Sequence, residues 1–161
     1  MTTERIPILL VDDDEDCRFL IKDAINSTEP ESEIYEAASG EEAISLLYGE
    51  TWDLNKPPPY LVFLDIDMPG MSGLEVLRVL KGNSSTRQIP VVMLTALDLE
   101  NTKLEAAENG ANSYCVKPSD PSRFYDIITK AAEYWLTVHS SSKNRTALSN
   151  CCVLEGAQQS Y

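Results

Sequence analysis

Residues 60–65 read YLVFLD, five apolar side chains followed by a carboxylate. An apolar run of this length is typical of a strand that is buried on both faces, as in a parallel sheet covered by helices. The same pattern recurs at ILLV before Asp12, at PVVML before Thr95 and at SYCV before Lys117. Four buried runs that all end in a polar residue indicate an open α/β fold whose polar ends gather at one edge of the sheet.

Segments with helical periodicity separate the apolar runs. Residues 17–25 carry one apolar face at three- and four-residue spacing, and residues 39–42 and 72–75 have the spacing of capping boxes, which begin helices. We expect strands at residues 6–11, 33–37, 60–64, 91–95 and 113–116, each followed by a helix, with the fourth helix over residues 98–109.

The spacing of the polar strand ends bears on the order of the strands. Thr95 follows Asp65 by 30 residues, about one βαβ unit, whereas Asp65 follows Asp13 by 52 residues, close to two units. This spacing fits a flavodoxin-like (βα)5 fold, a doubly wound parallel sheet with strand order 2-1-3-4-5. In that order the first and third strands are neighbours, so Asp12 and Asp13 are predicted to lie beside Asp65.

The chain has 161 residues, about the size of one domain. Thirteen Lys and Arg residues stand against 26 Asp and Glu residues, which gives a formal net charge of −13. This charge disfavours direct binding to nucleic acid phosphates or to anionic membranes, and no apolar stretch approaches the roughly 18 residues that a transmembrane helix needs. We therefore expect a cytoplasmic protein whose partners are proteins and cations.

A change in composition divides the chain near residue 138. Residues 5–138 hold the alternating strands and helices and are predicted to form one domain. Residues 139–161 are polar and Ser-rich, and they are predicted to be a disordered tail that is too short for an output domain. His139, Cys151 and Cys152 fall in this tail without the spacing of metal ligands.

The strand ends are predicted to bring three carboxylates, a hydroxyl and an ammonium into one crevice. Two carboxylates about 4 Å apart repel by about 4 kcal/mol at an effective dielectric near 20, so Asp12, Asp13 and Asp65 need a cation or a shared proton. Mg²⁺ takes oxygen ligands in octahedral geometry and bridges to phosphoryl oxygens. The cluster is therefore predicted to bind Mg²⁺ and to handle phosphoryl groups.

Four motifs in a fixed order resemble the receiver domain of bacterial response regulators: LVDD at residues 10–13, LDIDMP at 64–69 with Gly73, LTA at 94–96 and VKP at 116–118. The resemblance covers residues 5–138, and four separated motifs are far more specific than one. It implies a phosphorylation switch in two-component signalling. A narrower similarity, to small receiver-only regulators of bacterial phytochrome kinases, lies in the proline run at residues 56–59 and the aromatic pairs at 124–125 and 134–135.

The resemblance also implies a role for each catalytic and switch residue. Asp65 is the expected phosphoacceptor, and Thr95 and Lys117 are expected to hold the phosphoryl oxygens as the other catalytic residues. Movement of the Thr95 hydroxyl toward the phosphoryl group is the expected switch, because it vacates space into which Tyr114 can turn.

The expected metal ligands come from the same resemblance. Asp13 and Asp65 are expected to coordinate Mg²⁺ directly, Asp67 through its backbone carbonyl, and Asp12 mainly through water. The side chain of Asp67 places a further negative charge near the site. We expect this charge to affect both water access and the lifetime of the phosphoryl group.

Each of these residues has a plainer interpretation when it is taken alone. Aspartates after a strand are often helix N-caps, and Thr95 and Lys117 belong to residue types that are mostly exposed. The agreement of four motifs outweighs these interpretations. Tyr114 remains open, because a half-buried strand aromatic would look the same in the sequence.

The expected partners are a sensor histidine kinase or a phosphotransfer protein, which donates the phosphoryl group, and a downstream protein target. We expect a stand-alone regulator without enzymatic turnover. Tyr134 and Trp135 leave a homodimer contact open, although packing is the commoner role for such residues.

Two rivals come from other classes of protein. The run Asp65-Ile66-Asp67 resembles the nucleophile motif of haloacid-dehalogenase-type phosphatases. That motif is expected on an early first strand and not after an upstream acidic pair, and no cap domain is evident in the sequence. The other rival is a receiver-like interaction module that is never phosphorylated, and the complete set of Asp13, Asp65, Thr95 and Lys117 argues against it.

Overall fold

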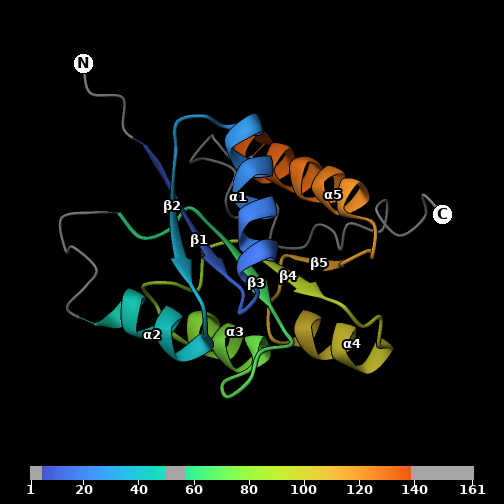
Figure 1. Cartoon of the computed structure of the whole chain (residues 1–161). Helices are drawn as coiled ribbons and strands as arrows, with labels where there is room; N and C mark the ends of the chain where they lie inside the picture. The colour runs from blue at the N-terminus through green and yellow to red at the C-terminus, as the bar shows by residue number, and fades with distance from the viewer. Residues whose placement is uncertain (1–4, 50–56, 139–161) are drawn as a thin grey trace.

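The computed structural model describes residues 5–49 and 57–138, which form one parallel sheet with helices on both faces (Figure 1). The sheet order is β2-β1-β3-β4-β5, so the predicted flavodoxin-like order is confirmed. The strands are β1 (Ile6–Val11), β2 (Ser32–Ala37), β3 (Leu61–Asp65), β4 (Val91–Thr95) and β5 (Ser113–Val116).

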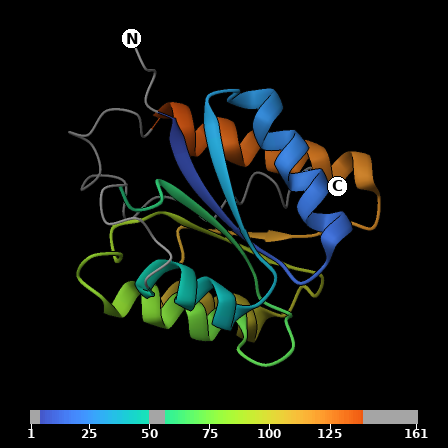
Figure 2. The ribbon, with the colours of Figure 1, turned by 60° about the vertical axis from the view of Figure 1, so that its left-hand side comes forward.

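Five helices alternate with the strands and cover the sheet in two layers. They are α1 (Glu15–Thr28), α2 (Gly40–Tyr48), α3 (Gly73–Gly82), α4 (Glu100–Glu108) and α5 (Pro121–Glu133), with a π-helical turn over Tyr134–Val138. Helices α1 and α5 lie on one face of the sheet, and α2, α3 and α4 lie on the other (Figures 1 and 2).

Strands β1, β3, β4 and β5 are buried on both faces, as the apolar runs predicted, whereas β2 is only partly buried. Along β1, Ile8 and Leu10 face the layer that also contains residues of α1 and α5, whereas Leu9 and Val11 face the layer that contains residues of α3. All four side chains are 0% exposed. Since burying one such side chain contributes about 1.5–3 kcal/mol, this two-sided core fixes where each strand ends.

Polar side chains begin the helices close to where the sequence placed them. Ser72 and Glu75 make a complete capping box, with Ser72 Oγ 3.3 Å from Glu75 N and Glu75 Oε2 2.8 Å from Ser72 N. Ser39 Oγ accepts from Glu42 N over 3.0 Å, but Glu42 Oε2 accepts from Ala38 N over 2.8 Å. The capping box predicted at residues 39–42 therefore has one of its two hydrogen bonds, because Glu42 binds the amide of Ala38 instead of the amide of Ser39.

Two helix ends differ from the sequence-based expectation. Helix α4 begins at Glu100 instead of residue 98, because the N-cap position falls on Leu99, whose side chain offers no capping oxygen. Helix α5 gives way to the π-helical turn at Tyr134, beyond which the 3.6-residue period does not hold. Trp135 lies in the core at 1% exposure, and its indole N–H donates to Ser113 Oγ over 2.9 Å.

Some sequence-based predictions fall on parts of the chain that the structure does not describe. The predicted tail at residues 139–161, with His139, Cys151 and Cys152, lies outside the described residues, as does Lys56 at the start of the proline run. Within the described ranges, no helix combines the length and apolar character needed to cross a membrane.

Candidate functional site

The polar ends of β1 and β3 are level with each other at one edge of the sheet. Val11 pairs with Leu64 in the parallel register of these strands, so the next residues, Asp12 and Asp65, stand side by side. At the same edge, Lys117 N donates to the backbone carbonyl of Thr95 over 2.7 Å. The topology therefore gathers the predicted site residues from four separate segments of the chain.

Three carboxylates converge in this crevice. Asp12, Asp13 and Asp65 each offer an oxygen within 4.8 Å of the other two. Asp12 is 0% exposed and Asp65 is 3% exposed, whereas Asp13 lies at the surface. The neighbouring Asp14 has the plainer role, because its Oδ1 accepts from Asp16 N over 2.9 Å and caps α1.

Lys117 brings the positive charge to the carboxylates from the end of β5. Its Nζ lies 2.7 Å from Asp12 Oδ2 and 3.1 Å from Asp65 Oδ1. Burial disfavours the ammonium, but the hydrogen bond to Asp12 and the charges of Asp65 and Asp12 outweigh burial and raise the pKa of Lys117 above its ordinary value. The lysine is therefore held as a cation between two carboxylates.

Asp65 has a buried carboxylate oxygen that lacks a hydrogen-bond partner. Burial raises its pKa to about 6, against the opposing charge of Lys117 and with a further increase from Asp12. Its buried Oδ1 has no hydrogen-bond partner, although Lys117 Nζ is close enough for an ion pair, because that contact lacks hydrogen-bonding geometry. A cation bound to this oxygen would stabilise the ionised form.

The chemistry of the donors fits Mg²⁺. The three carboxylates offer oxygen atoms alone, which is the ligand type that Mg²⁺ prefers, and the exposed Asp13 leaves one side of the cluster open to water. One oxygen of Asp65, a member of this group, is also buried without a hydrogen-bond partner. The side chain of Asp67 does not belong to this group of three.

Asp67 instead binds the end of β4. Its Oδ2 accepts from Thr95 Oγ1 over 2.8 Å and from Ala96 N over 3.3 Å. The Thr95 side chain is buried at 1% exposure and also accepts from Leu97 N over 3.1 Å. No pattern in the sequence indicates this contact, because it joins residues that are 28 positions apart.

Tyr114 is buried at 3% exposure, and not half-buried. Its hydroxyl lies 3.5 Å from the backbone oxygen of Leu97, which is also 3.2 Å from Thr95 Oγ1. Burial, followed by the charges of Asp98 and Asp67, raises the pKa of the Tyr114 phenol. The backbone oxygen of Leu97 thus lies within reach of both the Thr95 and the Tyr114 hydroxyls.

The loop between β3 and α3 is held by contacts that sequence patterns did not reveal. Glu41 Oε1, in the first turn of α2, accepts from Met71 N over 2.8 Å. Gly70 in this loop has φ +76°, which favours glycine. On the other side of the crevice, Arg18 Nη1 donates to the backbone oxygen of Asp12 over 2.7 Å. These contacts hold the backbone around the predicted site residues without involving the carboxylate oxygens of Asp12 and Asp65.

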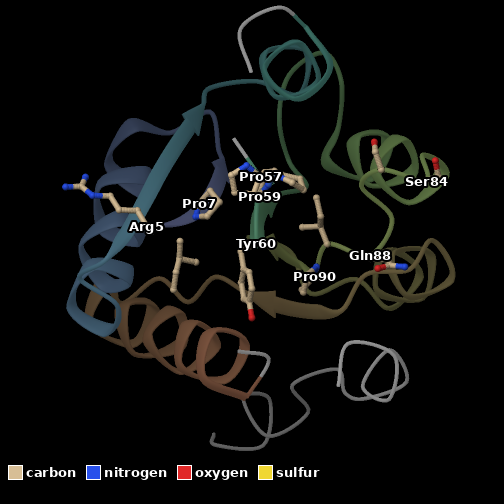
Figure 3. A pocket seen from close by; sticks show the side chains of 12 residues that line it. Arg5, Pro7, Pro57, Pro59, Tyr60, Ser84, Gln88 and Pro90 are labelled. Atoms are coloured by element: carbon tan, nitrogen blue, oxygen red, sulfur yellow. The ribbon is translucent and has the colours of Figure 1, made fainter. Parts of the chain in front are cut away.

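A second hollow lies at the opposite edge of the sheet. It encloses about 500 Å³ at the amino ends of β1, β3 and β4, and its lining includes Pro7, Pro57, Pro59, Tyr60 and Pro90 (Figure 3). The carboxylate crevice is at the carboxyl ends of the same strands. The proline-lined hollow is therefore separate from the site chemistry.

The comparisons with known proteins agree with this geometry. A model of the response regulator receiver domain matches residues 8–129. Response regulator PleD from Caulobacter vibrioides is 30% identical over 150 residues, which are 93% of this chain and 31% of PleD. The chain therefore spans less than a third of that relative's length.

Solved structures of response regulators have the same fold. The structure of the phosphorylated cyanobacterial phytochrome response regulator RcpA is 28% identical with a TM-score of 0.78, over 83% of this chain and 96% of that chain. The Mn²⁺-bound response regulator Rcp1 is 27% identical with a TM-score of 0.75, over 81% and 94% of the two chains. The predicted similarity to phytochrome response regulators is thus confirmed, and the chain belongs to the family of response regulator receiver domains.

Proposed function

We propose that this chain is a two-component regulator that accepts a phosphoryl group on Asp65 and thereby switches its binding to other proteins. The observation that carries the proposal is the state of Asp65. Its Oδ1 is buried without a hydrogen-bond partner, beside the carboxylates of Asp12 and Asp13 and within 3.1 Å of Lys117 Nζ. An acidic residue held in this way is suited to a cation and an incoming anionic group together.

We propose Asp13 and Asp65 as direct Mg²⁺ ligands, with Asp12 acting mainly through water and Asp67 through its backbone carbonyl. When it is bound, Mg²⁺ neutralises the carboxylates and the phosphoryl oxygens. The Mn²⁺-bound state of the similar regulator Rcp1 supports a divalent cation in this crevice.

The residues of the chain supply position and charge for the transfer. A carboxylate oxygen of Asp65 forms the new bond to phosphorus while the bond from phosphorus to the donor histidine nitrogen breaks, and the histidine leaves with that electron pair. Lys117 moves from Asp12 to a phosphoryl oxygen as the negative charge shifts. The Thr95 hydroxyl donates to another phosphoryl oxygen.

The partners follow from this chemistry. We propose a sensor histidine kinase or a phosphotransfer protein as the donor and a protein as the downstream target. Similarity to the phytochrome regulator RcpA, whose solved form is phosphorylated, supports a bacterial phytochrome kinase as donor. Turnover of a small substrate is not part of the proposal, and the proposed partners include, beside the downstream target, a second copy of the chain.

The phosphatase alternative is weakened by the side chain of Asp67. A second aspartate that acts on the leaving group must face the nucleophile, but Asp67 Oδ2 accepts from Thr95 and Ala96. The alternative of an unphosphorylated interaction module does not account for why Lys117 stays ion-paired to buried Asp12 and Asp65.

The test is the intact mass of the protein after incubation with acetyl phosphate and Mg²⁺. We expect the gain of one phosphoryl group that is labile to alkali, is absent in EDTA and is lost in Asp65→Asn. Asp14→Asn is the matched control, because Asn is as good an N-cap as Asp and position 14 lies outside the cluster. Failure to label the wild-type chain would favour the interaction module, whereas steady phosphate release from unrelated monoesters would favour the phosphatase.

A further inference from the structure

One oxygen of Asp67 accepts two hydrogen bonds at the carboxyl end of β4. Thr95 Oγ1 is 2.8 Å and Ala96 N is 3.3 Å from Asp67 Oδ2. Because the hydroxyl and the amide belong to adjacent residues and point to one position, together they bind an anion. In this structure the anion is a side chain of the protein itself.

The single proton of the Thr95 hydroxyl is committed to this contact. Its other acceptor within reach is the backbone oxygen of Leu97, at 3.2 Å. The carboxylate is closer and carries a charge, so it makes the stronger hydrogen bond. Leu97 N donates to Thr95 Oγ1 over 3.1 Å and holds the oxygen in place.

We infer that the Asp67 carboxylate is an internal competitor for the phosphoryl group at Thr95 and Ala96. The inference rests on the proposed phosphorylation of Asp65. When an oxygen of Asp65 bonds to phosphorus, the bond from phosphorus to the leaving atom breaks, and that atom is the histidine nitrogen of a protein donor or the acetate oxygen of acetyl phosphate. The phosphoryl oxygens then need the hydrogen-bond donors that Asp67 holds. The Thr95 hydroxyl must break its hydrogen bond to Asp67 before it can donate to a phosphoryl oxygen. The need for this exchange slows phosphorylation.

The position of Asp67 allows the exchange. The residue is exposed, so its carboxylate can turn into water when the donors are taken. Its proposed contact with Mg²⁺ uses the backbone carbonyl, which side-chain substitution leaves in place. The side chain of Asp67 therefore sets the rate of phosphorylation separately from the metal site.

The test compares initial rates of labelling by acetyl phosphate and Mg²⁺, followed by intact mass. In Asp67→Ala the hydrogen bonds to the competitor are absent, so we expect labelling about five- to tenfold faster, the factor for one hydrogen bond of ordinary net strength. In Asp67→Asn the amide oxygen still accepts but without charge, so we expect roughly a twofold increase. The control is Asp98→Ala, which removes the same charge at an exposed position near Thr95 and is expected to leave the rate unchanged.

A second measurement needs no phosphodonor. In ¹H–¹⁵N spectra the Ala96 amide proton is expected to move upfield in Asp67→Ala, because it loses its carboxylate acceptor, and to stay in place in Asp98→Ala. Far-UV circular dichroism of each variant confirms that the fold is kept.

The outcomes separate this inference from the proposed function. Normal labelling of the wild type with an unchanged rate in Asp67→Ala would overturn the competitor and leave the phosphoacceptor standing. Equal acceleration in Asp67→Asn and Asp67→Ala would replace competition for donors by simple charge repulsion. If neither the wild type nor any variant is labelled, the proposed function fails and the inference fails with it.

Discussion

Gly73 lies so close to Asp65 that a β-carbon on the glycine would stand 2.1 Å from the backbone oxygen of the aspartate. Gly73 N also donates to the backbone oxygen of Ile66 over 3.1 Å, so α3 begins directly against the end of β3. The position of Asp65 therefore depends on a close backbone contact with α3 that leaves no room for a side chain at position 73.

Gly73→Ala is expected to push α3 away from β3 and to displace Asp65. We expect a loss of about 1–3 kcal/mol in the free energy of unfolding, the usual cost of overpacking, together with slower labelling of Asp65. The matched control is Gly82→Ala in the same helix, where a β-carbon would meet nothing within 4 Å. There we expect a gain of up to about 1 kcal/mol, because alanine favours the helix. Urea denaturation measures both, and equal stability of the two variants would contradict the prediction.

Mg²⁺ is expected to stabilise the folded chain through Asp13. Binding to the folded state alone adds about 2.7 kcal/mol at a Mg²⁺ concentration of 100 times Kd, so the thermal midpoint should rise with Mg²⁺ in the wild type. Asp13→Asn should lose most of this response, and in EDTA it should be more stable than the wild type, because one of three repelling carboxylates is gone.

Asp14→Asn tests whether the Mg²⁺ response belongs to the cluster. It removes an adjacent charge while the helix cap is kept, so its thermal midpoint should respond to Mg²⁺ as the wild type does. A response that is lost equally in Asp13→Asn and Asp14→Asn would point to general charge screening.

The raised pKa of Asp65 predicts a pH dependence of stability in the absence of metal. The folded pKa of about 6 exceeds the ordinary value of 3.8, so the folded state binds the proton more tightly. The contribution of Asp65 to the free energy of unfolding is therefore greatest below about pH 4, falls as the pH rises to about 6 and stays low above that. The total loss in the free energy of unfolding is on the order of 2–3 kcal/mol.

Urea denaturation in EDTA at about pH 4 and about pH 7 measures this dependence against Asp65→Asn. The variant has no titrating group at this position, so its stability relative to the wild type should increase with pH. A difference between the two proteins that is the same at both pH values would contradict the raised pKa.

Lys81 is expected to be worth more to stability than an exposed lysine. Its Nζ donates to Ile89 O over 2.8 Å, to Asn112 Oδ1 over 3.0 Å and to Arg87 O over 3.1 Å. Burial lowers the pKa of Lys81 to about 8, which is a cost to the ammonium at neutral pH, and we expect the three hydrogen bonds to outweigh this cost. Lys81→Met removes the donor to the partly buried oxygen of Ile89 and one of the two donors to Asn112 Oδ1, which costs about 1–3 kcal/mol. Urea denaturation near neutral pH measures this loss.

The control for Lys81 is Lys22→Met, which breaks an exposed ion pair of 3.0 Å to Glu36. Such pairs contribute at most about 1 kcal/mol, so the loss should be small. Similar losses in the two variants would show that the Lys81 contacts carry little energy.

Much of the fold follows from the sequence because apolar runs and helix caps are local signals. The run at residues 60–65 predicted β3 within one residue, and the spacing of Asp13, Asp65 and Thr95 predicted the strand order. The pairing of Asp12 with Asp65 then follows from the neighbouring strands. These features need no knowledge of side-chain contacts.

Contacts between side chains that are far apart in the sequence could not be predicted from it. Asp67 was predicted to bind Mg²⁺ through its backbone carbonyl, whereas the structure also shows its carboxylate accepting a hydrogen bond from Thr95 Oγ1. Lys81 and Glu41 carried no signal, because their partners lie in other loops and neither periodicity nor spacing encodes them. The start of α4 was misplaced for a local reason, since Leu99 is an unusual N-cap.

Strand β5 contains Tyr114 and ends directly before Lys117, and it stands at one edge of the sheet. Within the described residues it pairs with β4 alone, through a ladder that includes Tyr114 opposite Met93. Because an edge strand is held by one ladder and not two, it yields more easily than β1 or β3 when Lys117 is pulled. Of the two edge strands, the one at the β4 side of the sheet is therefore the one that connects the ammonium to the phenol.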